Sequence, residues 1–181
     1  GLLDDYLKIV KKMPKGLIGR YKLVGQIIIG LFVGLVVYYL PAVDAERSST
    51  TIPFLKDFEL EFGIFYIFMV AFVITAMSNG SNLTDGLDGL LIGLSAIGAL
   101  AFGLIAYVTG RVDFSDYLNI IYIPQVGELT VYCAALLGAS LGFLWFNAYP
   151  AQVFMGDTGA LALGGAIATV AVLVKKELLL I

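Results

Sequence analysis

Hydrophobic residues fall into five long blocks along the chain, and short polar stretches separate them. Each block approaches the roughly 20 helical residues needed to cross a hydrocarbon layer about 30 Å thick. Because backbone groups cannot hydrogen-bond to lipid, we expect each block to be a helix. The pattern predicts an all-α integral membrane protein, a single transmembrane domain over residues 1–181 with about five transmembrane helices near 23–40, 60–77, 90–109, 129–146 and 159–174.

Composition supports this fold class. Hydrophobic residues make up 60% of the 181 residues and charged residues only 14%, far from the balance of a soluble domain. The 11 basic and 14 acidic residues give a net charge of −3, so no nucleic-acid partner is expected. The single cysteine, Cys133, lies inside an apolar block and is interpreted as a small buried residue.

The polar stretches alternate between the two sides of the membrane. Six of the 11 basic residues lie between positions 8 and 22, which places that segment in the cytoplasm by the positive-inside rule. Two crossings separate each polar stretch from the next, so 4–22, 78–89 and 147–158 should share the cytoplasmic face. Residues 41–59 should form an external hairpin centred on Thr50 to Ile52, and 110–128 an external loop. Two lysines at the outer end, Lys175 and Lys176, oppose the charge rule.

That convergence gathers acidic and amide side chains at one membrane surface: Asp4, Asp5, Asp85, Asp88 and Asp157, with Asn79, Asn82 and Asn147. Charged groups beside a bilayer are costly and are functional candidates by default. Crowded carboxylates repel one another unless a cation lies among them. Hard oxygen ligands in a chain without histidine favour Mg²⁺. The alternative interpretation is that these residues serve only as turn and helix-cap residues.

The arrangement within two stretches refines this hypothesis. If Asn82 caps the helix that follows, Asp85 and Asp88 lie on one face of its first turn. Phe154 lies in a loop rich in proline and glycine, where it could stack on a flat ring or simply pack. Gly156 leaves backbone room beside Asp157. The basic cluster that includes Lys8 could hold an anionic substrate or lipid head groups, or could serve as a topology signal alone.

Three motifs carry a family resemblance: Leu3-Asp4-Asp5-Tyr6-x-Lys8, Asn82-Leu-Thr-Asp-Gly-Leu-Asp-Gly89 and Asn147-Ala-Tyr-Pro-Ala-Gln-Val-Phe-Met-Gly-Asp157. In order and spacing they resemble the polyprenyl-phosphate N-acetylhexosamine-1-phosphate transferases. The third motif looks most like the branch that transfers phospho-N-acetylmuramoyl-pentapeptide. The resemblance covers residues 3 to about 165.

The resemblance implies a magnesium-dependent transferase of the bacterial inner membrane, with its active site on the cytoplasmic face. The reaction would join UDP-MurNAc-pentapeptide and undecaprenyl phosphate, giving lipid I and UMP for peptidoglycan and cell wall synthesis. Asp157 resembles the metal ligand, and Asp4 and Asp5 resemble the paired catalytic aspartates. The resemblance implies nucleotide-site roles for Asn82, Asp85, Asp88, Asn147 and Phe154, with Phe154 stacking on uracil and Lys8 at the same pocket. The predicted substrate-binding set also includes Asn79 and Gly156, because of their positions beside the acids.

Several alternatives stay open at this stage. A sister enzyme that moves N-acetylglucosamine-1-phosphate would share the aspartates and the metal, and a cation transporter or a structural subunit would use the acids differently. Direct attack by the lipid phosphate is favoured over a phospho-aspartate intermediate, and a homodimer is left open. The family has about ten transmembrane helices and a His-rich C-terminal loop, so we expect this chain to be a fragment of a ten-helix fold.

Overall fold

The computed structural model describes Tyr6, Val10 and residues 19–39, 48–51 and 59–180. Within these residues the long helices are α2 (Gly19–Tyr39), α3 (Tyr66–Thr84), α4 (Leu90–Thr109), α6 (Leu129–Asn147) and α7 (Gly156–Leu173). The shorter elements are β1 (Ser49–Thr51), β2 (Glu59–Glu61), α5 (Val112–Leu118) and the 3-10 helices η2 (Gly63–Phe65), η3 (Val126–Glu128) and η4 (Glu177–Leu180).

Five helices of the described chain are long and apolar enough to cross a membrane, which confirms the predicted fold class. The bounds of α4 match the expected span. The second helix differs most, because it begins at Tyr66 and continues to Thr84, about six residues later than the hydrophobic block suggested. The polar residues after Met77 therefore extend a helix that had been expected to end there.

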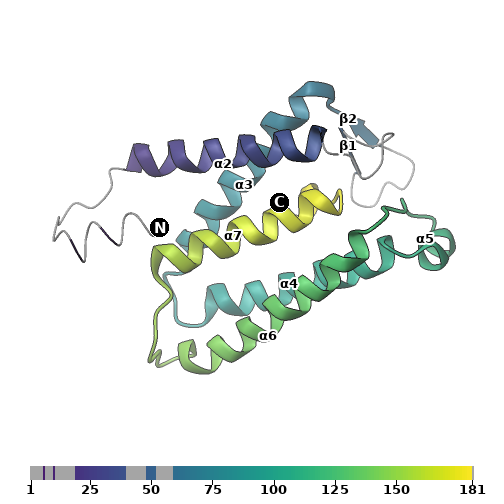
Figure 1. Cartoon of the computed structure of the whole chain (residues 1–181). Coiled ribbons are helices and arrows are strands. Elements are labelled where there is room, and N and C mark those ends of the chain that lie inside the picture. Colours follow the sequence, from purple (N-terminus) through teal and green to yellow (C-terminus); the bar gives the residue numbers. More distant parts are fainter. Residues whose placement is uncertain (1–5, 7–9, 11–18, 40–47, 52–58, 181) are drawn as a thin grey trace.

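Helix α3 is the central packing element, with α2 on one side and α7 on the other (Figure 1). Close approach depends on glycine at both interfaces. A Cβ on Gly30 of α2 would lie 2.8 Å from Ala71 Cα, and one on Gly164 of α7 would lie 2.4 Å from the Met77 carbonyl oxygen. Small residues let membrane helices approach backbone to backbone, so these glycines allow α2, α3 and α7 to pack closely.

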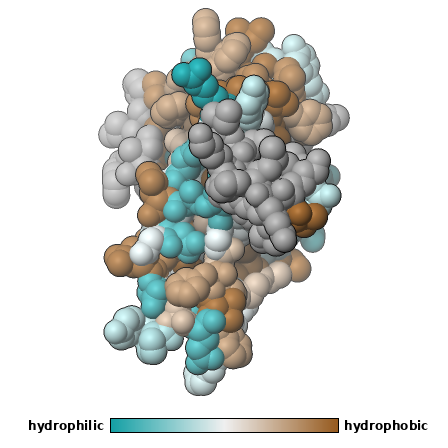
Figure 2. Space-filling view, turned by 90° about the vertical axis from the view of Figure 1, so that its left-hand side faces the viewer, coloured by the Kyte–Doolittle hydropathy of each residue, from teal (hydrophilic) through white to brown (hydrophobic). Residues whose placement is uncertain are grey.

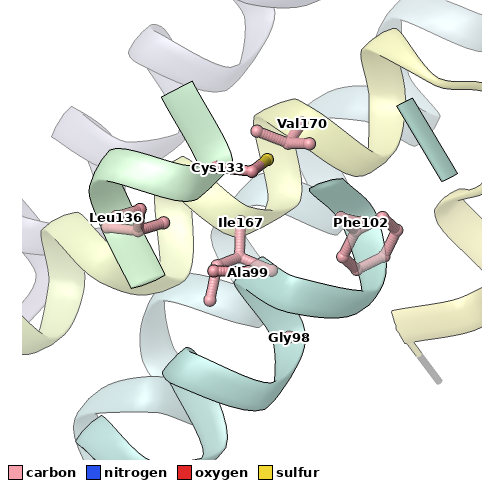
Figure 3. Close-up of a pocket in the computed structure, with 7 residues that line it drawn as sticks. All are labelled: Gly98, Ala99, Phe102, Cys133, Leu136, Ile167 and Val170. Carbon is pink, nitrogen blue, oxygen red and sulfur yellow. The ribbon is translucent and has the colours of Figure 1, made fainter. Parts of the chain in front are cut away.

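The second packing unit pairs α4 with α6, and α7 joins it to α3. A buried apolar cluster fills the space between α4, α6 and α7. Figure 3 shows part of it, with Cys133 of α6 facing Phe102 of α4 and Val170 of α7. Cys133 is only 1% exposed and has apolar neighbours, which confirms its interpretation as a small buried residue.

The two stretches expected outside the membrane contain regular structure. Strands β1 and β2 pair antiparallel, with Thr50 opposite Leu60. Thr50 therefore lies within the first strand, paired with the second, and its predicted position at the centre of the hairpin is wrong. The connection over 110–128, predicted as an external loop, contains helix α5 and the 3-10 helix η3.

Candidate active site

One end of the helix bundle gathers the candidate site residues. The last turn of α3, the start of α4, the last turn of α6 and the start of α7 all lie at the left of Figure 1. Figure 2 views the molecule from this side, and hydrophilic residues gather at its centre with hydrophobic residues around them. The described parts of two predicted polar stretches, 78–89 and 147–158, therefore meet at one end of the bundle.

The second motif is built differently from the prediction. Helix α3 continues to Thr84, so Asn82 lies in its last turn and does not cap the following helix. Asp85 is the C-cap residue of α3, and its N–H donates to the Ser81 carbonyl oxygen at 3.1 Å. Helix α4 begins only after Gly89, whose φ of 75° is left-handed. Asp85 and Asp88 therefore lie in the turn between two helices, and their expected place on the first turn of α4 is wrong.

Asp157 lies in the first turn of α7, where the expected loop has already become helix. Gly156 precedes it with a φ of 67°, a conformation that favours glycine because it has no Cβ. A carboxylate in the first turn of a helix is stabilised by the helix dipole. The sharp turn at Gly156 thus delivers Asp157 to the positive end of α7.

A lysine that the motifs do not contain completes this part of the site. The Lys22 Nζ of α2 lies 2.8 Å from Asp157 Oδ2, across 135 positions of sequence. The sequence placed Lys22 only within a general basic cluster. Nothing in its local pattern singled it out, because the pairing requires α2 to lie against the α3–α7 pair.

The two carboxylates Asp85 and Asp157 are close enough to affect each other. Burial raises the pKa of Asp85 above its usual value, and the negative charge of Asp157 raises it further. A hydrogen bond from the backbone of Gly156 lowers the pKa in part. The end of α3 and the start of α7 therefore form one electrostatic unit, in which an added cation would relieve repulsion.

Asn147 connects the turn before α4 to the loop before α7 through hydrogen bonds. Its side chain is buried, and its Oδ1 accepts a hydrogen bond from the Gly89 N–H at 3.1 Å. Its Nδ2 donates to the Val153 carbonyl oxygen at 2.8 Å. Both polar atoms of Asn147 thus bond to the backbone of the two site loops. Asn147 therefore supports the site in this structure, and its predicted contact with substrate stays a prediction.

Asp88 also spans the two loops, since its Oδ2 accepts a hydrogen bond from the Ala151 N–H at 3.0 Å. Asn79 is exposed, and its Nδ2 donates to Gln26 Oε1 of α2 at 2.7 Å and to the Thr75 carbonyl oxygen at 2.8 Å. Asn82 is half-buried near the end of α3. Asn79 thus links α3 to the helix that carries Lys22, and Asp88 links the turn that carries Asp85 to the loop before Asp157.

Phe154 has no such structural role. Its side chain is 71% exposed, although it lies between Val153, whose carbonyl oxygen accepts a hydrogen bond from Asn147, and the turn at Gly156. An exposed aromatic ring offers a flat apolar face on which a planar ligand could stack, and this role of Phe154 stays a prediction. Asp4, Asp5 and Lys8 lie outside the described residues, and their predicted proximity to this end of the bundle stays a prediction.

The donor set suits a hard cation. Asp157 and Asp85 supply carboxylate oxygens, and an ammonium group, that of Lys22, already lies beside Asp157. Among the described residues no group of three acidic, histidine or cysteine side chains could enclose a metal ion. A magnesium ion fits such an open site, because it usually keeps several waters and shares its ligands with substrate phosphates.

The family follows from comparison with known sequences. The sequence profile described as "Glycosyl transferase family 4" matches residues 1–175. The chain belongs to this family. The predicted resemblance is thereby confirmed, and the match spans all three motifs that carried it.

Curated relatives carry a more specific name than the family profile. Proteins named phospho-N-acetylmuramoyl-pentapeptide-transferase from Chloroherpeton thalassium and Chlorobium limicola are 52% and 53% identical to it over 180 residues. A relative of the same name from Parabacteroides distasonis is 44% identical over 217 residues. Each alignment covers 99% of this chain and 49 to 52% of the relative. This family member therefore spans about half the length of the curated relatives it matches.

Proposed function

We propose that this chain contributes the cytoplasmic active site of an enzyme that transfers phospho-N-acetylmuramoyl-pentapeptide from its UDP carrier to undecaprenyl phosphate. Lipid I and UMP would be the products, in the inner membrane of a bacterium. The observation that carries the proposal is the group formed by Asp85, Asp157 and Lys22 at the end of three spanning helices. The shared name of the relatives supports the choice of substrate.

The site residues suit phosphoryl transfer, which depends on positioning and charge neutralisation more than on covalent help. Lys22 offers a mobile ammonium group that can turn from Asp157 to a substrate phosphate, because lysine carries its charge on a flexible chain. The exposed ring of Phe154 offers a stacking surface for uracil. Asn147 and Asp88 connect the turn that carries Asp85 to the loop that carries Phe154.

We infer that Asp157, with Asp85 nearby, holds Mg²⁺. A bound magnesium ion would neutralise charge on the diphosphate and orient the phosphorus for attack. Asp85 would change its proton affinity in response, because its pKa already depends on the charge at Asp157. We further propose that Asp4 and Asp5 lie beside the lipid phosphate, where one of them accepts a proton while the phosphate oxygen attacks directly.

The test uses the full-length protein in lipid nanodiscs. UDP-MurNAc-pentapeptide and UDP-N-acetylglucosamine are supplied in turn with undecaprenyl phosphate, and UMP release is measured with and without magnesium. We expect turnover of the muramoyl donor only, dependent on magnesium. Turnover of the N-acetylglucosamine donor alone would replace this substrate with that of the sister enzymes.

The variant Asp157→Asn distinguishes the metal assignment from general damage. It preserves shape and one oxygen but removes the charge, so we expect magnesium-dependent turnover to fall by about 100-fold, the usual loss for one group that stabilises transition-state charge. Asp113→Asn, an exposed aspartate of α5 at the other end of the bundle, is the matched control. Near-normal activity of a folded Asp157→Asn protein would contradict the assignment.

A further inference from the structure

A buried polar cluster lies at the end of the bundle opposite the candidate active site, and the proposed reaction does not use it. It consists of Thr50 on β1, Tyr66 at the start of α3, and Lys175 and Glu177 after α7, and we refer to it as the far-end clamp. Tyr66, Thr50 and Glu177 have no exposed surface, and Lys175 is 9% exposed. Burying charged groups is costly unless their partners are in place.

The partners are in place around the carboxylate of Glu177. The Tyr66 hydroxyl donates to Oε1, and the Thr50 hydroxyl donates to Oε2. Lys175 Nζ donates to the Tyr66 hydroxyl oxygen at 3.0 Å and lies 4.1 Å from the centre of the Tyr66 ring. The clamp thus joins three separate segments: the hairpin, α3 and the end of α7.

Neighbouring contacts strengthen the same junction. The Thr51 hydroxyl donates to the Lys175 carbonyl oxygen at 2.9 Å, and Lys176 Nζ donates to the Thr51 hydroxyl at 2.7 Å. These bonds explain why two lysines occur at the end where the charge rule opposed them. The ammonium group of Lys175 bonds to Tyr66 of α3 and that of Lys176 to Thr51 of the hairpin.

The clamp lies on the same helix pair as the site carboxylates. Helices α3 and α7 run antiparallel, and their contacts continue along their length: Tyr66, Val70 and Ile74 pack with Val172 and Ala168. Nearer the site, Ser78 Oγ donates to the Leu161 carbonyl oxygen at 3.1 Å. Asp85 and Asp157 lie beyond this contact, at the site end of the α3–α7 interface.

The register of this interface decides how far Asp157 lies from Asp85. Each residue adds about 1.5 Å along a helix, so a slip of α7 by one residue would move Asp157 by that distance. Apolar contacts between small side chains resist such a slip weakly, since they have no direction. Hydrogen bonds to a buried carboxylate are directional and strong, and their loss leaves a buried charge without partners.

We propose that the far-end clamp is a positioning device, in which Glu177, held by Tyr66 and Thr50, fixes the register of α7 on α3 and thereby holds Asp157 beside Asp85. The clamp is about 27 Å from the site, the length of an 18-residue helix. Glu177 and Tyr66 are thus positioning residues that touch no substrate. Only the activity part of the test rests on the proposed function.

The distance test uses the full-length protein in nanodiscs with Cys133→Ala as background. Spin labels at Leu83→Cys on α3 and Ala162→Cys on α7 report the register near the site, since both positions are exposed in the described chain. Glu177→Leu removes both acceptor oxygens. We expect the distance distribution to shift by about 1.5 Å or to broaden by at least that amount. Glu177→Gln keeps an acceptor and should restore the distribution.

A second variant and a control keep the outcome interpretable. Tyr66→Phe removes only one hydroxyl and should fold even if Glu177→Leu does not, with a smaller change in the same direction. Glu61→Leu alters an exposed glutamate of the same hairpin and should leave the distances unchanged. Unchanged distances in both clamp variants would overturn the proposal, even if thermal stability falls.

The activity arm measures the magnesium concentration for half-maximal turnover. Because a misplacement of about 1 Å can cost up to about 100-fold in rate, we expect kcat to fall at least tenfold in Glu177→Leu and the magnesium requirement to rise. Glu177→Gln should recover both. A shift in distance with unaltered magnesium requirement would overturn the link to Asp157. Absence of turnover in the unmodified protein would contradict the proposed function and leave the distance result to decide the clamp.

Discussion

Lys22 of α2 and Asp157 of α7 form an ion pair with Nζ 2.8 Å from Oδ2, although 135 positions separate them in sequence. Their side chains are 24% and 32% exposed, so solvent screens the pair. Partly exposed pairs of this kind contribute about 1 kcal/mol or less to stability. The arrangement therefore matters more for the charge it presents at the site than for the fold.

Replacing Lys22 should separate these roles. In Lys22→Gln the ammonium no longer competes for Asp157, so the protein without substrate should bind a divalent cation more tightly. Titration with Mn²⁺ followed by electron paramagnetic resonance measures this affinity. Stability in detergent should change by no more than about 1 kcal/mol. Weaker cation binding by a stable variant would contradict the idea that lysine and metal share one carboxylate.

The exposed ring of Phe154 predicts a defect confined to the donor. Phe154→Ala should weaken binding of UMP by about 1–3 kcal/mol, the usual loss for one base-stacking residue. Calorimetry with UMP checks the affinity. Tyr149→Ala alters another exposed aromatic residue of the same loop and should have a much smaller effect. Equal affinity in Phe154→Ala and the unmodified protein would make Phe154 a surface residue without a role in binding.

Glu177 predicts how stability responds to pH. Burial raises the pKa of Glu177, while hydrogen bonds from Thr50 and Tyr66 and the charge of Lys175 lower it in part. A raised pKa means that the folded state holds the proton more tightly than the unfolded chain. Protonated Glu177 therefore stabilises the folded state. This stabilisation is fully present below the unfolded pKa of about 4.3 and is lost as pH rises through the raised pKa of the folded state.

Glu177→Gln cannot titrate at this position, so it should lack that loss. We expect the melting temperature of the variant, relative to the unmodified protein, to rise as the pH increases above about 4.3. Thermal unfolding monitored in nanodiscs at several pH values measures the difference. Glu61→Gln serves as the exposed control. A relative melting temperature that falls with pH would contradict the direction of the shift.

The paired acids Asp4 and Asp5 predict the order of chemical steps. A phospho-aspartate route would release UMP in a stoichiometric burst when the enzyme meets the donor without lipid. We expect no such burst. We also expect the slowed turnover of Asp4→Asn or Asp5→Asn to recover in part at higher pH, because the lipid phosphate then loses its proton without help, with a second pKa near 6 as in other phosphomonoesters. A trapped aspartyl adduct would contradict direct attack.

The hydrophobic pattern determined the number and type of the long elements. Each block of apolar residues became one of the five spanning helices, because lipid demands helical backbone over the whole block. Helix α4, with few polar residues and a glycine before it, matched its expected bounds from Leu90 to Thr109. The alternation of spans also brought the polar stretches around Asp85 and Asp157 to one end, since that follows from counting crossings.

Packing decided the details that hydropathy does not encode. The stretch after Met77 is polar enough to resemble a loop, yet α3 continues to Thr84 because Ser78 and Ser81 face α7, where Gly164 allows close approach. For the same reason Asn82 lies in the last turn of α3 and does not cap α4. A helix end is set by the neighbour it packs on as well as by its own residues.

The pairings across the sequence belong wholly to the tertiary structure. Lys22 meets Asp157 because α2 and α7 both pack on α3, and Glu177 meets Tyr66 and Thr50 because η4 lies between the start of α3 and the hairpin. Each of these residues looks ordinary in its own segment, as a basic residue near a helix start or a glutamate after a helix end. Hydropathy along the chain is a local property, and it is enough to predict which chemical groups lie at each end of the bundle. The bonds between those groups join segments more than 100 positions apart, so they depend on how the helices pack.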